Sequence, residues 1–151
     1  MGLPERIQKE LTEAMKARDE LRLRVLRMVK TALHNRQVEK MRPLDEAEAV
    51  QVLQTLVKQR REAIEQFAKG GRADLVATET RELALLESYL PAPPTQEELD
   101  AAIQDAIREI GAASPKQMGA VIKAARERLA GKAVDGKVLA DRVRAWLSQP
   151  G

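Results

Sequence analysis

Apolar residues recur every three or four positions along almost the whole chain, and this spacing restricts the possible folds more than any other feature. One run has offsets of 0, 4, 7, 8 and 11 and consists of Leu99, Ile103, Ala106, Ile107 and Ile110. Such spacing places the side chains on one face of an α-helix, whereas a half-buried strand alternates with a period of two. Aromatic residues make up only 2% of the chain, which argues against a strand-rich fold. The sequence therefore predicts an all-α protein.

A cluster of prolines divides the predicted helices into two groups. Pro91, Pro93 and Pro94 lie within four residues, and a helix cannot continue through them. We expect an N-terminal helical domain over residues 1–90, a proline linker over 91–95 and a C-terminal three-helix tail domain over 96–151. About four helices are expected before the prolines and three after them.

Local signals mark where several of these helices begin. Asp45 with Glu48 and Thr95 with Glu98 have the spacing of a capping box. Asp19 and Asp135 are further candidate caps, and Ser114 followed by Pro115 has the pattern of a cap and a first-turn proline. Gly70 and Gly71 lie between two apolar stripes, so we expect a long antiparallel helical hairpin around them.

One charged residue interrupts the apolar seam of the predicted hairpin. The seam runs through Val50, Leu53, Val57, Ile64 and Phe67, and Arg60 occupies its fourth position. A charge in a seam needs a partner because desolvation of a lone charge is costly. Counting from the Gly-Gly turn places Glu82 opposite Arg60, with Glu79 one turn away. We therefore expect a partly buried ion pair from Arg60 to Glu82 or to Glu79.

The residue types exclude several kinds of chemistry. The chain has no cysteine, which rules out disulfides, cysteine-bound zinc and thiol catalysis. His34 is the only histidine, so no histidine-paired nucleophile or histidine metal cluster can form. No catalytic residues, metal or cofactor are predicted. No run approaches about 18 apolar residues, and the first residues lack a signal-peptide pattern, so we expect a soluble, cytoplasmic protein without a membrane partner.

Positive charge is concentrated in two stretches. Residues 1–42 carry eleven Lys and Arg against six Asp and Glu, a net +5, and Arg24, Arg27 and Lys30 share one arc of their predicted helix. Residues 116–144 carry eight against three, also a net +5, whereas residues 95–109 have a net charge of −4. Such charge is typical of a solvated helix face, and the alternative is a phosphate-binding surface.

The candidate nucleic-acid-binding residues lie in the second basic stretch. They are Lys116, Lys123, Arg126, Gly131, Lys132, Lys137 and Arg144. The segment 131–137 favours the phosphate-binding alternative slightly, because its two glycines allow close backbone approach and a helix begins after it. Its spacing is not that of a P-loop.

Several motifs occur in the order found in one known family. They are Arg27-Met28-Val29-Lys30, Lys58-Gln59-Arg60-Arg61, Arg72-Ala73-Asp74-Leu75, the segment from Glu82 to Pro91, Glu97-Glu98-Leu99, Met118-Gly119 and Gly131-Lys132-Ala133. With matching gaps over nearly the whole chain, the sequence resembles the GatB/YqeY domain family, and in particular its free-standing YqeY-like members.

This resemblance implies a fold and a class of partner. Similar domains form the C-terminal part of one component of the aspartyl/glutamyl-tRNA amidotransferase, where the tail domain binds tRNA. The family-level label is carbon–nitrogen ligase with glutamine as amido-N-donor. By resemblance, tRNA contact would involve Lys116, Met118, Gly119 and Lys123, together with Gly131, Lys132 and Lys137. Within that set, the apolar stripe assigns Met118 to the core, and Gly119 is interpreted as a close helix-packing point.

Two main hypotheses follow. The first is a tRNA-binding accessory protein that recognises shape and phosphates. The second is a non-catalytic protein-interaction module that docks through helix faces, for example onto a synthetase or an amidotransferase component. A third, an amide-transfer enzyme, depends on the family-level label alone.

Overall fold

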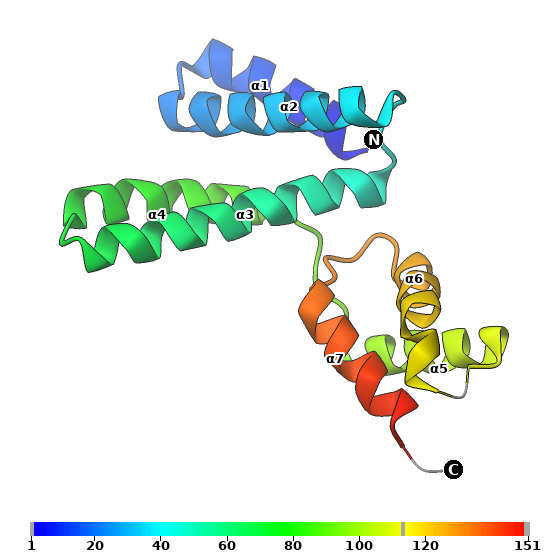
Figure 1. Ribbon diagram of the computed structural model, residues 1–151. Coiled ribbons are helices and arrows are strands. Elements are labelled where there is room, and N and C mark those ends of the chain that lie inside the picture. The colour runs from blue at the N-terminus through cyan, green and yellow to red at the C-terminus, as the bar shows by residue number, and fades with distance from the viewer. Residues whose placement is uncertain (1, 113, 150–151) are drawn as a thin grey trace. The chain divides into compact units, whose positions relative to one another are not determined.

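The computed structural model describes residues 2–112 and 114–149. These residues form seven α-helices and one short 3₁₀-helix, without a strand, so the predicted all-α fold is confirmed (Figure 1). The chain divides into two compact units, Met1–Pro91 and Ala92–Gly151. Four α-helices belong to the first unit and three to the second.

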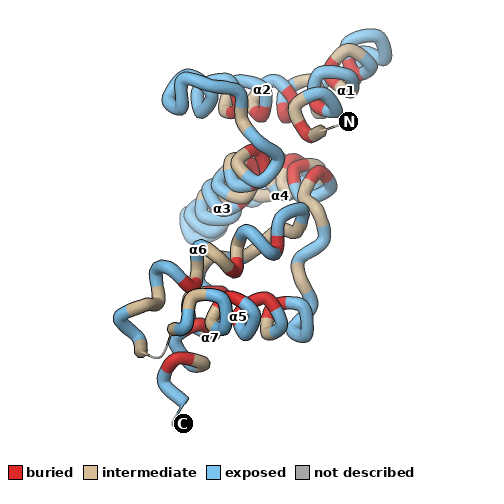
Figure 2. The backbone as a smooth tube through the Cα atoms, turned by 90° about the vertical axis from the view of Figure 1, so that its right-hand side faces the viewer, coloured by how far each residue is buried: buried red, intermediate tan, exposed pale blue. Residues whose placement is uncertain are grey.

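The N-terminal unit consists of two pairs of helices. One pair is α1 (Leu3–Ala17) and α2 (Glu20–Lys40), and the other is the hairpin of α3 (Glu46–Lys69) and α4 (Ala73–Ser88). Buried residues lie on the sides of the helices that face one another (Figure 2). The largest fully buried side chains of this unit are Ile7, Leu26, Leu53, Leu86, Val25 and Val29. The hairpin turns at Gly71, whose φ of 72° favours glycine.

The C-terminal unit has its own core. It contains α5 (Gln96–Ile110), the 3₁₀-helix η1 (Pro115–Gln117), α6 (Met118–Arg128) and α7 (Gly136–Leu147). Its fully buried side chains include Ile103, Val121, Leu139 and Val143. The Arg142 guanidinium and the Trp146 indole N–H of α7 both donate hydrogen bonds to Asp100 of α5. These bonds, above all those from Arg142, hold the pKa of Asp100 below its usual value.

Most of the predicted helix starts are confirmed. The Asp45–Glu48 and Thr95–Glu98 capping boxes are both complete. Asp19 and Asp135 also accept hydrogen bonds from backbone N–H groups of the helices that they begin. Ser114 is the exception, because its side chain makes no capping bond and Pro115 begins a 3₁₀-helix rather than the α-helix.

Arg42 reinforces the capping box at the start of α3. Its guanidinium donates to both carboxylate oxygens of Glu48, at 2.7 and 2.9 Å. This contact, together with the hydrogen bond from the Asp45 backbone N–H, lowers the pKa of Glu48 to about 2. Charged Glu48 therefore stabilises the folded state above its ordinary pKa of about 4.5, and this contribution is lost as the pH falls towards 2.

We expect Glu48→Gln to remove one acid-sensitive contribution to stability. The free energy of unfolding of the variant should lie below that of the unmodified chain at pH 7, and the difference should shrink between about pH 5 and pH 2. Urea titrations at four pH values measure it. A difference that stays constant with pH would contradict this assignment.

Met41 ends α2 in an unfavourable backbone conformation. Its φ is 56°, in the left-handed region, and its side chain is 91% exposed. Glycine adopts this conformation without the steric cost of a Cβ, and no packing is lost on truncation. We therefore expect Met41→Gly to raise the free energy of unfolding by about 0.5–1 kcal/mol, measured by chemical denaturation. Arg36→Gly, inside α2, should instead destabilise by about 1 kcal/mol.

The proline segment is attached to the C-terminal unit just after its first proline. The backbone N–H of Ala133, in the loop before α7, donates to the carbonyl of Ala92 at 3.1 Å. That loop therefore packs against the proline segment that precedes α5. Within the described residues, no helix combines the length and the apolar character needed to cross a bilayer.

Candidate nucleic-acid interface

Arg126 lies beside the first residue of α7. One terminal nitrogen of its guanidinium is 2.9 Å from the position that a Cβ on Gly136 would occupy. Lys137 follows Gly136 and is exposed, while its backbone N–H is satisfied by Asp135. The fold therefore brings the guanidinium of Arg126 to the same end of α7 as Lys137, although they are eleven positions apart in sequence.

The loop between α6 and α7 contributes Gly131 and Lys132. Gly131 has a φ of 89°, so a side chain there would be strained. The Nζ of Lys132 lies 3.6 Å from a carboxylate oxygen of Glu98 in α5. The pKa of Glu98 is lowered first by the hydrogen bond from the Thr95 backbone N–H and then by the charge of Lys132. Lys132 thus faces the start of α5 and is partly neutralised.

Lys116 and Lys123 lie on η1 and α6 and are exposed. Lys123 and Arg126 are three residues apart on α6, so they occupy adjacent turns of one side of the helix. Gly119 lies between the two lysines, is exposed, and has no atom within 4 Å of a Cβ built on it. The expectation that Gly119 is a close packing point is therefore wrong, whereas Met118 does pack against the core as expected.

The cations of the C-terminal unit differ in whether they have a partner. Within the described part of the chain, no carboxylate forms an ion pair with Lys116, Lys123, Arg126 or Lys137. The remaining ones each have a carboxylate partner: Arg108 with Asp105, Arg128 with Glu109, Lys132 with Glu98, Arg142 with Asp100, and Arg144 with Asp141. Arg144 and Lys132 are thus the two predicted site cations whose charge is already engaged.

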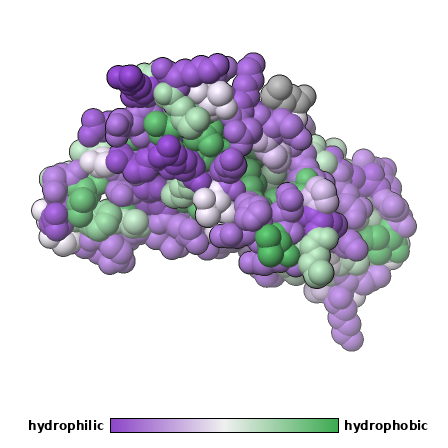
Figure 3. Space-filling view, turned by 90° about the horizontal axis from the view of Figure 1, so that it is seen from above, coloured by the Kyte–Doolittle hydropathy of each residue, from purple (hydrophilic) through white to green (hydrophobic). Residues whose placement is uncertain are grey.

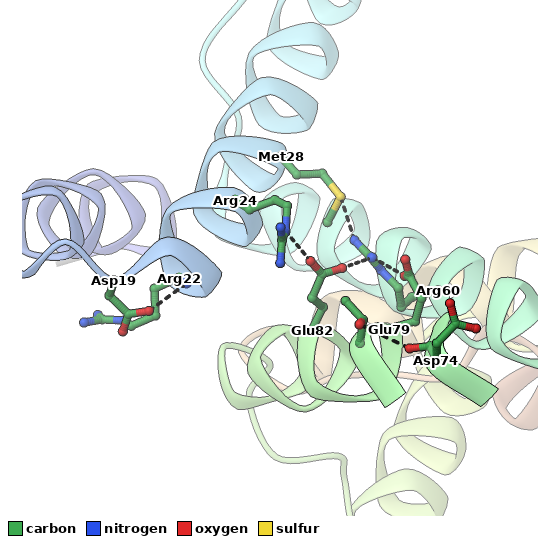
Figure 4. Close-up of polar contacts among 9 residues, drawn as sticks. Asp19, Arg22, Arg24, Met28, Arg60, Asp74, Glu79 and Glu82 are labelled. Carbon is green, nitrogen blue, oxygen red and sulfur yellow. Dashed lines mark hydrogen bonds and ion pairs between the residues drawn. The ribbon is translucent and has the colours of Figure 1, made fainter. Parts of the chain in front are cut away.

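A partly buried charged cluster in the N-terminal unit confirms the expected partners of Arg60. Its guanidinium donates to both Glu79 and Glu82. Glu82, whose side chain is 4% exposed, also accepts from the Nε of Arg24 at 2.5 Å. Figure 4 shows Glu82 between the two arginines. Arg60 also donates to the Met28 sulfur at 3.1 Å. The cluster joins α2, α3 and α4. Because Arg24 is paired with Glu82, its charge is not free, unlike, among the described residues, the charges of Arg27 and Lys30 on the same arc of α2.

Hydrophilic residues cover most of the face shown in Figure 3, and hydrophobic residues form small separate patches there. In residues 2–112 and 114–149, no three metal-ligating side chains gather into a group that could hold a metal ion. Two helical units, one of which has four cations without carboxylate partners among the described residues, define the chain as a small all-helical protein.

Comparison with known proteins identifies the family. The family model described as Yqey-like protein matches residues 4–147, and the chain belongs to this family. The chain is 33% identical over 112 residues to "Altered inheritance of mitochondria protein 41, mitochondrial" of Kluyveromyces lactis, covering 72% of this chain and 60% of the relative. The Eremothecium gossypii protein of that name is 33% identical over 107 residues, 69% of this chain and 58% of the relative. The chain thus spans about three fifths of the length of these relatives.

Proposed function

We propose that this protein is a tRNA-binding accessory protein whose C-terminal unit holds the phosphate backbone. The supporting observation is that Lys116, Lys123, Arg126 and Lys137 lack a carboxylate partner among the described residues, whereas other cations of the same unit are paired. An unpaired cation neutralises a phosphate without first giving up an ion pair, so these four are the primary contacts. Lys132 and Arg144 are secondary contacts, because each exchanges one exposed carboxylate for a phosphate.

The proposed recognition uses charge and shape rather than base sequence. Helical RNA displays phosphates and 2′-hydroxyls that a rigid basic surface contacts without reading bases. Gly131 keeps the loop before α7 free of a side chain where the RNA backbone approaches. The acidic residues Glu97, Asp105 and Glu109 of α5 are exposed and repel phosphates, so they restrict how RNA can lie on the unit.

A salt-dependent binding series tests this function. We expect the logarithm of the tRNA association constant to fall linearly with the logarithm of salt concentration, with a slope of about −0.7 to −0.9 per neutralised phosphate. Lys123→Ala and Lys137→Ala should each make the slope shallower by about one unit. Fluorescence anisotropy with the full chain and unfractionated tRNA measures both quantities.

Arg108→Ala is the matched control for these variants. Arg108 is exposed and paired with Asp105, so its loss should change the slope less than the loss of Lys123 or Lys137. The absence of binding at low salt would overturn the proposed function. Equal changes of slope in all three variants would show that net charge, not the four unpaired cations, determines binding.

The activity and location of the protein are further parts of the proposal. The carbon–nitrogen ligase label of the family is attributed to multidomain relatives, and we propose that this chain binds rather than catalyses. The sequence favours the cytoplasm, whereas the curated relatives carry the word mitochondrial in their names. Imaging of a tagged full chain separates the two locations.

A further inference from the structure

One exposed face of α2 combines cations with large apolar side chains. Arg27, Lys30, His34, Val38 and Met41 follow one another at intervals of three or four residues, so they share one side of the helix and of its last turn. We call these five residues the α2 stripe. Val38 is 61% and Met41 91% exposed, and both are among the four most exposed large hydrophobic residues of the described chain.

The end of α2 lacks the packing that normally holds a helix in place. Every residue from His34 to Met41 is exposed, so these two turns contribute nothing to the core. Helical segments in proteins depend mainly on the burial of an apolar face. Met41 additionally holds a left-handed conformation while its side chain remains in solvent. The end of α2 therefore has an apolar surface that the N-terminal unit itself does not cover.

The cations of the stripe are also unsatisfied. In the described part of the chain, no carboxylate forms an ion pair with Arg27 or Lys30. The neighbouring cations along the chain are paired: Arg24 with Glu82, Arg36 with Glu39, and Lys40 and Arg42 with Glu48. The free positive charge of this helix thus lies on the same side as Val38 and Met41, at the opposite end of the stripe.

We propose that the α2 stripe binds an acidic amphipathic helix of a partner protein. Carboxylates of that helix face Arg27 and Lys30, and its apolar residues cover Val38 and Met41. The stripe extends over about four turns, roughly 21 Å, which suits a helix of ordinary length. A nucleic acid would satisfy the cations but would leave the two apolar side chains in water, so the composition favours a protein helix. The stripe shares no residue with the proposed tRNA contacts.

A designed peptide serves as the probe for this surface. The peptide is an 18-residue helix with Glu and Leu on one face, spaced to oppose the cationic and apolar ends of the stripe. Titrated into the ¹⁵N-labelled full chain, it should shift amide resonances within residues 27–41. A peptide of the same composition in scrambled order should bind at least about tenfold more weakly.

Variants of the chain separate charge, apolar contact and folding. Arg27→Glu with Lys30→Glu should weaken peptide binding by more than about tenfold, while Lys9→Glu with Lys16→Glu on α1 changes net charge equally and should leave it nearly unchanged. Met41→Gly should weaken binding several-fold although it stabilises the folded chain, so a loss of binding cannot come from unfolding. Met15→Gln, half-exposed on α1, is the apolar control.

Four results would overturn the proposal. They are the absence of localised shifts at 1 mM peptide, equal binding of the scrambled peptide, equal weakening by the α1 charge variant, and unchanged binding of Met41→Gly. Protection of the same amides by tRNA, with the designed peptide displaced and no effect of Met41→Gly, would assign the stripe to RNA instead. None of these results bears on Lys123 and Lys137, so the proposed tRNA function is tested separately.

Discussion

Replacing Arg60 with alanine is expected to lower the free energy of unfolding of the N-terminal unit by about 3–5 kcal/mol. Arg60 is 14% exposed and donates to two carboxylates, of which Glu82 is 4% exposed. Removal of the guanidinium would leave two carboxylates close together, with only the Arg24 guanidinium to offset them. The cost arises mainly from this uncompensated buried charge, not from the lost attraction alone.

The adjacent arginine provides the control. Arg61 pairs with Glu87, but both side chains are largely solvated, at 63% and 41% exposure, so Arg61→Ala should cost no more than about 1 kcal/mol. Urea unfolding followed by far-UV circular dichroism measures both variants, while the fluorescence of Trp146 reports the C-terminal unit. Similar losses for the two variants would show that the cluster is not the buried network described here.

Leu139→Ala should destabilise the C-terminal unit by about 2–5 kcal/mol. Leu139 is completely buried in the core of that unit, and its truncation leaves a cavity in addition to the lost burial. A unit of about 60 residues has little stability in reserve. We therefore expect Trp146 fluorescence to report unfolding at lower urea concentration, while much of the helical signal persists.

Val138→Ala is the neighbouring control for this second prediction. Val138 is 48% exposed, so its truncation should change the free energy of unfolding by about 0.5 kcal/mol or less. If fluorescence and circular dichroism shift together in Leu139→Ala, the two units unfold as one cooperative body. Separate transitions would establish that each core is stable independently.

Local signals explain why the fold class and helix starts could be predicted from sequence. A capping box such as Thr95 with Glu98 contains donor and acceptor within four residues, so its formation depends little on distant parts of the chain. Ser114 shows the limit of such signals, because the same residue pattern also fits the 3₁₀-helix observed there.

Contacts between helices were predictable only where the sequence contained a conflict. Arg60 interrupts an apolar seam, and this conflict indicated both of its partners. Arg24 lies on a face that looks solvated, and its partner Glu82 is 58 residues away, so no local pattern revealed it. Gly119 belongs to a family motif, but whether a glycine lies in a close contact depends on neighbours that the sequence does not place.

The same distinction between partners that are near in sequence and partners that are distant applies to the cations of the candidate site. The partner of Arg144 is Asp141, three residues earlier on one helix, and this pair could have been read from the sequence. Lys132 pairs with Glu98, which comes from another helix, and the proximity of Arg126 to Gly136 also depends on tertiary packing. Sequence thus indicates which stretch is basic, and the fold determines which charges are free.

The two hydrophobic cores share no residue, which has a consequence for biosynthesis. Every side chain that the first core buries has been translated before Ala92 is added. Synthesis of the following sixty residues takes roughly 3–12 s at about 5–20 residues per second, far longer than small helical domains need to fold. The first unit can therefore fold while the chain is still on the ribosome. The second unit then emerges joined to a unit that is already folded.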